Sequence, residues 1–229
     1  MKNNIKFVAF DADDTLWVNE NYFREAEHAF CHLMMDWLPH EKTADELFKT
    51  EMQNLELFGY GAKGFALSLI ETAVRISDGK ITGRQVQQII DIVKRLLARP
   101  VELLPDVPEV LRTLKEKYTL VLATKGDLLD QQRKIAKSGL AEYFAHTEIM
   151  SDKRPQDYVR LLQRLGAGAQ EFVMVGNSLK SDVLAPLEAG AYAVYVPYPI
   201  IWKHECTPEP QSPRYYKAEK LRDILRFLL

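Results

Sequence analysis

The chain has few cysteines, almost no net charge and no long hydrophobic run, and each shortage excludes a class of protein. Only two cysteines, Cys31 and Cys206, occur among 229 residues, so a secreted domain held together by disulfides is not expected. Lys and Arg number 30 against 32 Asp and Glu, and the resulting net charge of -2 provides no attraction for nucleic acid or for an anionic membrane. No apolar run approaches the roughly 20 residues that cross a bilayer.

The remaining composition is ordinary for a soluble globular protein, with 47% hydrophobic and 27% charged residues. The length allows one large domain, or a core domain with a smaller one inserted into it. Residues 1–5 lead straight into an apolar segment, which leaves no room for a signal peptide. Together with the low cysteine content, this predicts a cytoplasmic protein.

The first apolar segment ends in a cluster of carboxylates. Residues 5–10 are short, apolar and typical of a buried strand, and Asp11, Asp13 and Asp14 follow within four positions. Like charges at this spacing repel one another and raise one another's pKa, so a fold that keeps them together requires a cation. The cluster therefore predicts an oxygen-lined site for a hard divalent metal.

The next part of the chain shows helical periodicity and no strand pattern. From about residue 22 to 99 the apolar positions recur at helical spacing, and Asn21, Thr43 and Thr82 or Gly83 stand where helices need capping groups. The predicted helices cover roughly 20–37, 43–57, 63–77 and 83–98.

After Pro100, helices and strands alternate, which favours parallel strand pairing because a parallel connection needs a crossover. The predicted fold is α/β, with a doubly wound, Rossmann-like parallel sheet formed by residues 1–17 and 100–229 and an all-helical domain inserted at 18–99. The proline-rich residues 197–213 are expected to form a loop that packs across a sheet edge or over the site. Predicted strands are 119–123, 147–150, 172–175 and 191–196, and predicted helices are 108–117, 128–138, 156–165, 180–189 and 221–229.

Four of the predicted strands run into polar residues at their carboxyl ends, where open parallel sheets bind ligands. These are Asp11 and Asp13 after the first strand, Thr124 after the second, Lys153 after the third, and Asn177 followed by Asp182 after the fourth.

These residues make the chain resemble the haloacid dehalogenase-like hydrolase superfamily, in its phosphatase branch with a small helical (C1-type) cap. The resemblance covers residues 5–17 and about 101–196. Its four motifs match Asp11-Ala12-Asp13-Asp14-Thr15, Ala123-Thr124-Lys125-Gly126, Lys153-Arg154-Pro155, and Gly176-Asn177-Ser178-Leu179-Lys180-Ser181-Asp182.

The resemblance implies Mg2+-dependent hydrolysis of a small phosphorylated metabolite. Asp11 would attack phosphorus and form an aspartyl-phosphate, and Asp13 would act as the general acid and base. Thr124 and Lys153 would hold and neutralise the phosphoryl group. The Mg2+ ligands would be Asp11, the backbone carbonyl of Asp13, Asp182 and Asn177, with Asp14 only a turn residue. Asn177 stands where the family usually has an acid, so the site carries one negative charge fewer.

Other residues are weaker candidates for binding. Lys125 lies beside Thr124 and is a candidate substrate contact, although lysines such as Lys125 and Lys180 are more often solvated. The loop at residues 58–65 contains three glycines around Tyr60 and Lys63, which suits either a flexible lid that selects substrate or an ordinary helix–helix turn.

A zinc site in the helical insert is the disfavoured reading of its histidines. His28, Cys31 and His32 have the spacing of zinc ligands on a helix, but further ligands are absent, so a helix surface is preferred.

Three alternative functions share parts of this pattern. A 2-haloacid dehalogenase would use the Asp11 nucleophile but needs neither metal nor a second acid, so Asp13 and Asp182 argue against it. A sugar phosphomutase fits the same motifs and stays open. A phospho-accepting receiver, which is a binding switch, has its acids in a different order along the chain. The protein is expected to be a monomer or a homodimer.

Overall fold

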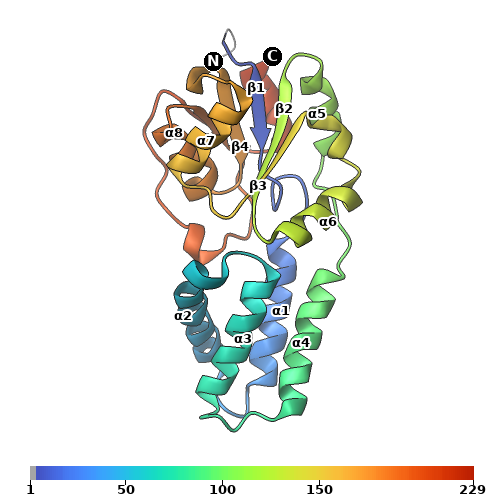
Figure 1. Cartoon of the computed structure of the whole chain (residues 1–229), viewed down its shortest axis with the longest axis vertical. Helices are drawn as coiled ribbons and strands as arrows, with labels where there is room; N and C mark the ends of the chain where they lie inside the picture. The colour runs from blue at the N-terminus through green and yellow to red at the C-terminus, as the bar shows by residue number, and fades with distance from the viewer. Residues whose placement is uncertain (1–3) are drawn as a thin grey trace. The chain divides into compact units, whose positions relative to one another are not determined.

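Parallel strands form one sheet at the centre of one of the two compact units of the chain (Figure 1). The computed structural model describes residues 4–229, so residues 1–3, which the sequence predicts to enter the first strand without a signal peptide, lie outside the described residues. Within that range the sheet has six strands in the order β3-β2-β1-β4-β5-β6. Their bounds are β1 Phe7–Phe10, β2 Thr119–Lys125, β3 His146–Met150, β4 Phe172–Gly176, β5 Tyr192–Tyr195 and β6 Tyr215–Lys217.

The strand β1 lies between β2 and β4 and pairs in parallel with both. Its first residue pairs with the first residue of each neighbour. Phe7 pairs with Thr119 on one side and with Phe172 on the other. The chain leaves β1 toward β2 on one side and later returns to β4 on the other, so the strand order reverses next to β1. This confirms the doubly wound sheet and places its ligand-binding switch point at the end of β1.

Helices cover both faces of the sheet, which explains why β1 is apolar at every position. Val8 and Phe10 pack with α5 on one face, while Ala9 packs with Tyr158 of α7 on the other. The first face is covered by α5 (Val107–Lys115), α6 (Leu128–Ser138), the 3-10 helix η5 (Leu221–Ile224) and α9 (Leu225–Leu228), and the second by α7 (Pro155–Leu165) and α8 (Ala185–Glu188).

The structure corrects the predicted elements near the end of the chain. The strand β6 was missed, because only three residues pair and its tyrosines are half-buried at the sheet edge. The predicted helix at 180–189 is a π-helix, η3 (Leu179–Leu184), followed by α8, and the helix predicted at 221–229 begins as a 3-10 turn. The wider turns of η3 shift the direction of its side chains, which periodicity alone does not reveal.

The second compact unit comprises residues 21–100 and 126–130. Its described residues contain helices and no strand, and a separate apolar core that includes Phe30, Leu47, Leu69 and Ile89 holds them together. Its helices are α1 (Glu20–Leu33), α2 (His40–Phe58), α3 (Ala62–Ile76) and α4 (Gly83–Leu97). The sequence predicts an inserted domain at residues 18–99, and these bounds stay a prediction.

The helix ends show where local sequence signals succeed and fail. Thr82 caps α4 in a reciprocal arrangement with Gln85, as predicted. The prediction at Thr43 was wrong, because α2 begins at His40 and the buried Thr43 hydroxyl donates to the carbonyls of Leu38 and Pro39. Asn21 also does not begin a helix, since α1 begins at Glu20.

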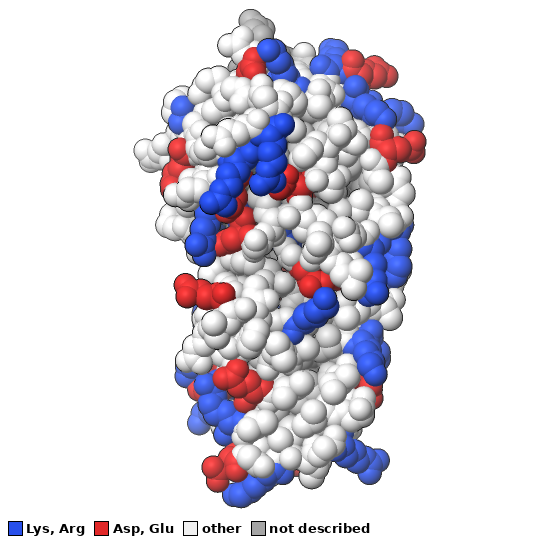
Figure 2. All heavy atoms as spheres, viewed as in Figure 1, with Lys and Arg blue, Asp and Glu red and all other residues white. Residues whose placement is uncertain are grey.

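No helix among residues 4–229 is both long enough and apolar enough to cross a bilayer. On the face shown in Figure 2, basic side chains lie next to acidic ones, in agreement with the net charge of -2.

Candidate active site

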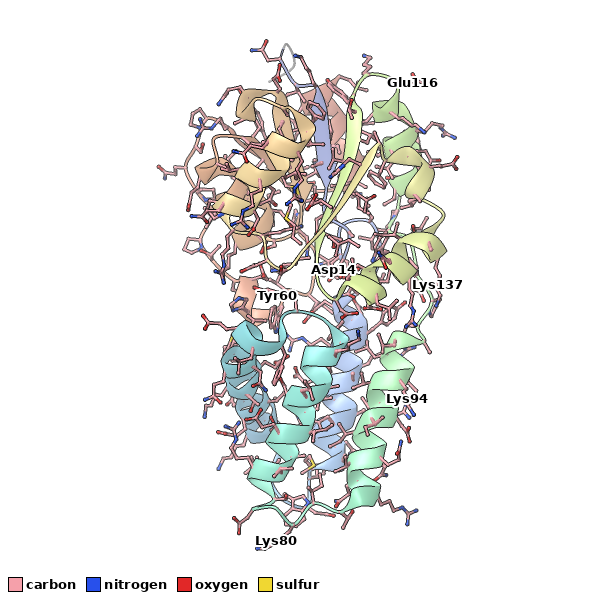
Figure 3. All side chains as sticks on the ribbon, in the orientation of Figure 1. Asp14, Tyr60, Lys80, Lys94, Glu116 and Lys137 are labelled. Carbon is pink, nitrogen blue, oxygen red and sulfur yellow. The ribbon has the colours of Figure 1, made fainter. Side chains whose placement is uncertain are left out.

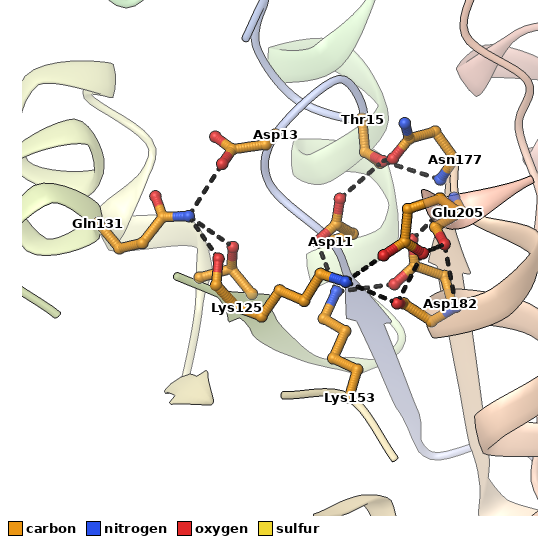
Figure 4. A network of polar contacts seen from close by, with 12 residues as sticks. Asp11, Asp13, Thr15, Lys125, Gln131, Lys153, Asn177, Asp182 and Glu205 are labelled. Atoms are coloured by element: carbon orange, nitrogen blue, oxygen red, sulfur yellow. Dashed lines mark hydrogen bonds and ion pairs between the residues drawn. The ribbon is translucent and has the colours of Figure 1, made fainter. Parts of the chain in front are cut away.

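The site residues that the sequence predicts after β1, β2, β3 and β4 lie close together at the carboxyl ends of these strands (Figure 4). Phe10, the last residue of β1, pairs with Leu122 and with Val175. The strand β4 ends one residue further on, at Gly176, whereas β2 continues to Lys125. The amide of Asp11 donates to the carbonyl of Val175 at 2.9 Å, which fixes the start of the acidic loop against β4.

A buried lysine joins two of the predicted carboxylates. Lys153 is 4% exposed, and its ammonium contacts Asp11 and lies 2.7 Å from Oδ1 of Asp182. Burial and the nearby charge of Asp182 raise the pKa of Asp11 to about 7, although Lys153 acts in the opposite direction. A further cation would stabilise the ionised form of Asp11 that a nucleophile requires.

The second carboxylate, Asp182, fits closely against the end of β4. Its Oδ2 accepts from the backbone amide of Ser178 at 3.0 Å, while its Oδ1 accepts from Lys153. A Cβ atom at Gly176 would lie 2.2 Å from Asp182 Oδ2, so only glycine leaves room for this carboxylate. Both oxygens of Asp182 therefore have protein donors, and its role as a direct metal ligand stays a prediction.

Oxygen atoms converge at Asn177 in a way that suits a metal. One terminal atom of the Asn177 amide lies 3.2 Å from the carbonyl oxygen of Asp13 and 3.3 Å from Asp11 Oδ2. Neighbouring ligands in an octahedral Mg2+ shell, with metal–oxygen distances of about 2.0–2.1 Å, lie about 3 Å apart. With a cation present the amide oxygen would face these atoms, and without one the amide nitrogen satisfies them. The residues present fit Mg2+.

This ligand set differs from clusters built on acidic, histidine and cysteine side chains. No group of three such side chains among residues 4–229 could hold a metal. The set at Asn177 uses one carboxylate, one amide and one backbone carbonyl. In α1, Cys31 is buried and His28 Nδ1 lies 3.0 Å from Nε2 of His40. His28 and His32 are both exposed, which is the helix-surface position that the sequence predicts for them.

Three donors surround the carboxylate of Asp13. Trp17 Nε1 donates at 2.7 Å, Gln131 Nε2 at 2.9 Å and Lys134 Nζ at 2.9 Å. Sequence reasoning missed Gln131 and Lys134. They lie three positions apart on α6, whose first turn follows the carboxyl end of β2, but polar pairs at this spacing are common on helices and did not single them out.

The end of β2 carries Thr124 and Lys125. The buried Thr124 hydroxyl accepts from Gln131 Nε2 at 3.1 Å, which links Thr124 to Asp13. The expectation that Lys125 is solvated was wrong, because its side chain is only 16% exposed and its ammonium lies 2.9 Å from Ser181 Oγ. Lys180 is exposed, as expected.

A buried glutamate completes the network and was not predicted. Glu205 ends the 3-10 helix η4 (Lys203–Glu205), and it accepts from Lys125 and from the hydroxyls of Ser178 and Ser181. Burial alone would raise its pKa, but Lys125 and the two hydroxyls outweigh burial and lower the pKa to about 2. The proline-rich segment at 197–213 thus packs over the site, one of the two placements that the sequence predicts.

The remaining acid of the first motif has a structural role. Asp14 is buried at a positive φ of 58°, and its carboxylate accepts from the backbone amides of Asn19 and Glu20 where α1 begins. Burial raises its pKa to about 8. Asp14 is the turn residue that the sequence predicts. Its carboxylate also accepts hydrogen bonds from backbone amides at the start of α1 that have no partner within the helix.

Tyr60 and Lys63 belong to the helical unit. Tyr60 lies between α2 and α3 at one end of that unit, and Lys80 lies at its other end (Figure 3). Lys63 Nζ lies 3.0 Å from Asp127 Oδ2, inside the same unit. Contact of Tyr60 and Lys63 with substrate stays a prediction.

Comparisons with known proteins show which family the chain resembles. A family model described as haloacid dehalogenase-like hydrolase matches residues 5–190. A crystal structure of a haloacid dehalogenase-like family hydrolase from Xanthomonas campestris is 39% identical, with a TM-score of 0.87, and the match covers 96% of this chain and 88% of that one.

Two curated relatives carry a more specific name. Glyceraldehyde 3-phosphate phosphatase from Methanothermobacter thermautotrophicus is 28% identical, over 84% of this chain and 85% of the relative. The protein of the same name from Methanopyrus kandleri is 25% identical, with 84% of each chain covered.

Proposed function

Because the chain belongs to the haloacid dehalogenase-like hydrolase family, we propose that it hydrolyses a small phosphate monoester in a Mg2+-dependent reaction. The observation that carries the proposal is the buried contact of Lys153 with both Asp11 and Asp182, next to a second acid, Asp13, in the same loop. The names of the two curated relatives support a small phosphorylated substrate. We further expect a cytoplasmic enzyme that acts as a monomer or a homodimer.

Asp11 is the proposed nucleophile. A phosphate monoester dianion repels an anionic nucleophile, so the ammonium of Lys153 beside Asp11 reduces the repulsion and orients the attacking oxygen. Attack on phosphorus forms an aspartyl-phosphate and releases the alcohol. Water then hydrolyses this intermediate and regenerates Asp11, which divides one difficult step into two easier ones.

Asp13 is the proposed proton carrier. It would give a proton to the leaving oxygen in the first step and take one from the attacking water in the second. Gln131 bridges Asp13 and the Thr124 hydroxyl, so the proton carrier and the proposed phosphoryl contact are held by one side chain.

The metal would be held by Asp11, the carbonyl of Asp13 and the amide oxygen of Asn177. When bound, Mg2+ would neutralise negative charge on the phosphoryl group as it transfers. Asp182, whose oxygens accept from Lys153 and the Ser178 amide, would hold Lys153 against Asp11 and also contribute negative charge to the metal region.

A phosphate-release screen over a panel of phosphorylated metabolites, with and without Mg2+, tests the proposal. We expect Mg2+-dependent release from at least one small monoester, and loss of that release in Asp11→Asn. Halide release from 2-haloacids without Mg2+ would replace the proposal with a dehalogenase. An isomerised sugar phosphate in place of free phosphate would replace it with a phosphomutase, a reaction that uses the same acids.

A further inference from the structure

Three lysines near the strand ends each contact a carboxylate, and together with these carboxylates they are called the strand-end network. Figure 4 shows two of the lysines, Lys153 and Lys125. Lys153 contacts Asp11 and Asp182, as described above. The other two pairs are Lys134 with Asp13 and Lys125 with Glu205. Within this network of the described core residues, four carboxylates face three ammonium groups.

The Lys125–Glu205 pair has no part in the proposed chemistry, yet it is built into the site. Glu205 is 8% exposed, and its carboxylate accepts hydrogen bonds from the side chains of Lys125, Ser178 and Ser181. The backbone amide of Ser178 in turn donates a hydrogen bond to Asp182. A carboxylate is costly to bury, and here a lysine and two hydroxyls compensate it. Glu205 also lies beyond residues 5–190, the part of the chain that matches the family model.

The charge balance of the site limits the substrates that it favours. With a divalent cation bound, the network would carry an excess of one positive charge, while a phosphate monoester brings two negative charges. A second anionic group on the substrate would find no uncompensated ammonium in this network, because the carboxylate of Glu205 neutralises Lys125. Desolvating an unpaired anion is unfavourable.

We propose that Glu205, through its ion pair with Lys125, selects phosphate monoesters whose alcohol part is uncharged over those that carry a second anionic group. The inference rests on the proposed function and narrows its substrate class. Glu205 is here a specificity-determining residue that acts through Lys125, and the aldehyde, polyol or sugar phosphates are the substrates that it favours.

The test compares two substrates that differ at one carbon, glyceraldehyde 3-phosphate with an aldehyde and 3-phosphoglycerate with a carboxylate. The measured quantity is the ratio of kcat/KM for the two substrates in the intact protein with Mg2+. The wild type is expected to favour the aldehyde. Glu205→Gln removes one negative charge and is expected to raise the relative kcat/KM for the carboxylate about tenfold, which corresponds to about 1.4 kcal/mol.

Variants at Lys125 separate charge from packing. Lys125→Met is expected to shift the ratio further toward the aldehyde, and the double variant Lys125→Met/Glu205→Gln, which removes both charges, is expected to return it toward the wild-type value. A purely structural role of Glu205 would change kcat/KM for both substrates alike. Thermal unfolding of each variant shows that it is folded. If Glu205→Gln does not fold, comparison of Lys125→Met with the double variant still measures the effect of removing Glu205.

Several results would overturn the inference. A wild type that prefers 3-phosphoglycerate contradicts it, and so does an unchanged ratio in folded Glu205→Gln. These results leave the phosphatase proposal intact, because phosphate is still released. If the wild type releases phosphate from no monoester, the proposed function fails and the inference fails with it.

Discussion

The amide of Asn177 gives the proposed metal site an oxygen ligand without a negative charge. One of its terminal atoms lies within 3.3 Å of Asp11 Oδ2 and the Asp13 carbonyl, so the side chain is already at the distance of a neighbouring ligand. Charge on the ligands sets the affinity for a hard cation, which means that this single residue type should govern how much Mg2+ the enzyme needs.

Asn177→Asp is expected to lower the Mg2+ concentration that gives half-maximal activity by about three- to tenfold, because a carboxylate adds attraction for the cation at the same position. Initial rates measured over a Mg2+ titration provide the test. The matched control for added charge is Gln170→Glu, at an exposed position of the unit that contains the sheet. An unchanged titration in Asn177→Asp would place residue 177 outside the metal shell.

Gly176 is required by the close approach of Asp182 rather than by its own backbone angles. Gly176→Ala would place Cβ 2.2 Å from Asp182 Oδ2 and 2.4 Å from its Cγ, so Asp182 must move away from Lys153. We expect phosphate release to fall at least about 100-fold and the free energy of unfolding to fall by roughly 1–3 kcal/mol.

The control for this substitution is Gly83→Ala at the start of α4, where a Cβ meets no atom within 4 Å. It is expected to leave activity and stability near wild type. Full activity in a folded Gly176→Ala protein would show that the contact between Asp182 and Lys153 is dispensable.

At the scale of elements, the helix that follows β2 explains which site residues were missed. The sequence predicts α6 and its bounds correctly at 128–138, and it predicts that β2 ends at the site. Gln131 and Lys134 still passed unnoticed, because which face of a helix turns toward a sheet edge depends on how the helix packs. The spacing of apolar residues in a helix indicates which face is buried, but it does not indicate which side chains the polar residues of that helix contact.

The turn between α2 and α3 is tied to the segment that follows β2. A Cβ at Gly61, which has φ of +104°, would lie 3.0 Å from the Asp127 amide, and Lys63 pairs with the Asp127 carboxylate. Gly64 also lacks space for a side chain, because a Cβ there would lie 2.7 Å from the Gly59 carbonyl. These close approaches define a specific turn, and Asp127 follows Lys125 by only two positions in the chain.

Changing Tyr60 and Lys63 to Ala is therefore expected to alter the ranking of substrates by severalfold in kcat/KM, because the turn loses its aromatic ring and its ion pair. The ranking is measured on the phosphate-release panel. Lys80→Ala, at the other end of the helical unit, removes an exposed lysine that pairs only loosely with Asp78 at 3.6 Å and serves as the control. Identical substrate rankings in the variant and the wild type would show that this turn only connects two helices and does not select substrate.

At the scale of the whole molecule, the buried charges make stability depend on pH. The pKa of Glu205 in the folded protein is about 2, below its ordinary value of 4.5. The unfolded chain thus takes up a proton at Glu205 before the folded protein does as the pH falls. The stabilisation is fully present above pH 4.5 and is lost as the pH falls toward 2.

Glu205→Gln should therefore differ from wild type by a constant free energy of unfolding above about pH 5.5, and by progressively less below pH 4.5. The pH-dependent part amounts to about 3 kcal/mol, the equivalent of the difference between a pKa of 4.5 and one of about 2. Urea unfolding of both proteins between pH 3 and pH 7 measures it, and other groups that titrate alike cancel in the difference. A difference that stays constant down to pH 3 would contradict a lowered pKa of Glu205 in the folded state.

The sequence alone determined the strand-and-helix order, the parallel sheet and the identity of Asp11, Lys153 and Asp182 as neighbours. It could do so because buried parallel strands are apolar throughout and because their carboxyl ends lie at one edge, so order along the chain implies proximity. The short edge strand β6 and the π-turns of η3 carry no such pattern, and they were missed.

Only the tertiary structure decided how each charge is compensated. Lys125 contacts Glu205, which lies 80 residues further along the chain in a 3-10 helix of the proline-rich loop. Asp13 contacts Lys134 of α6, 121 residues further along. Local propensity cannot specify such pairs, because their energy arises from burial and from the distance between atoms that only the folded chain brings together.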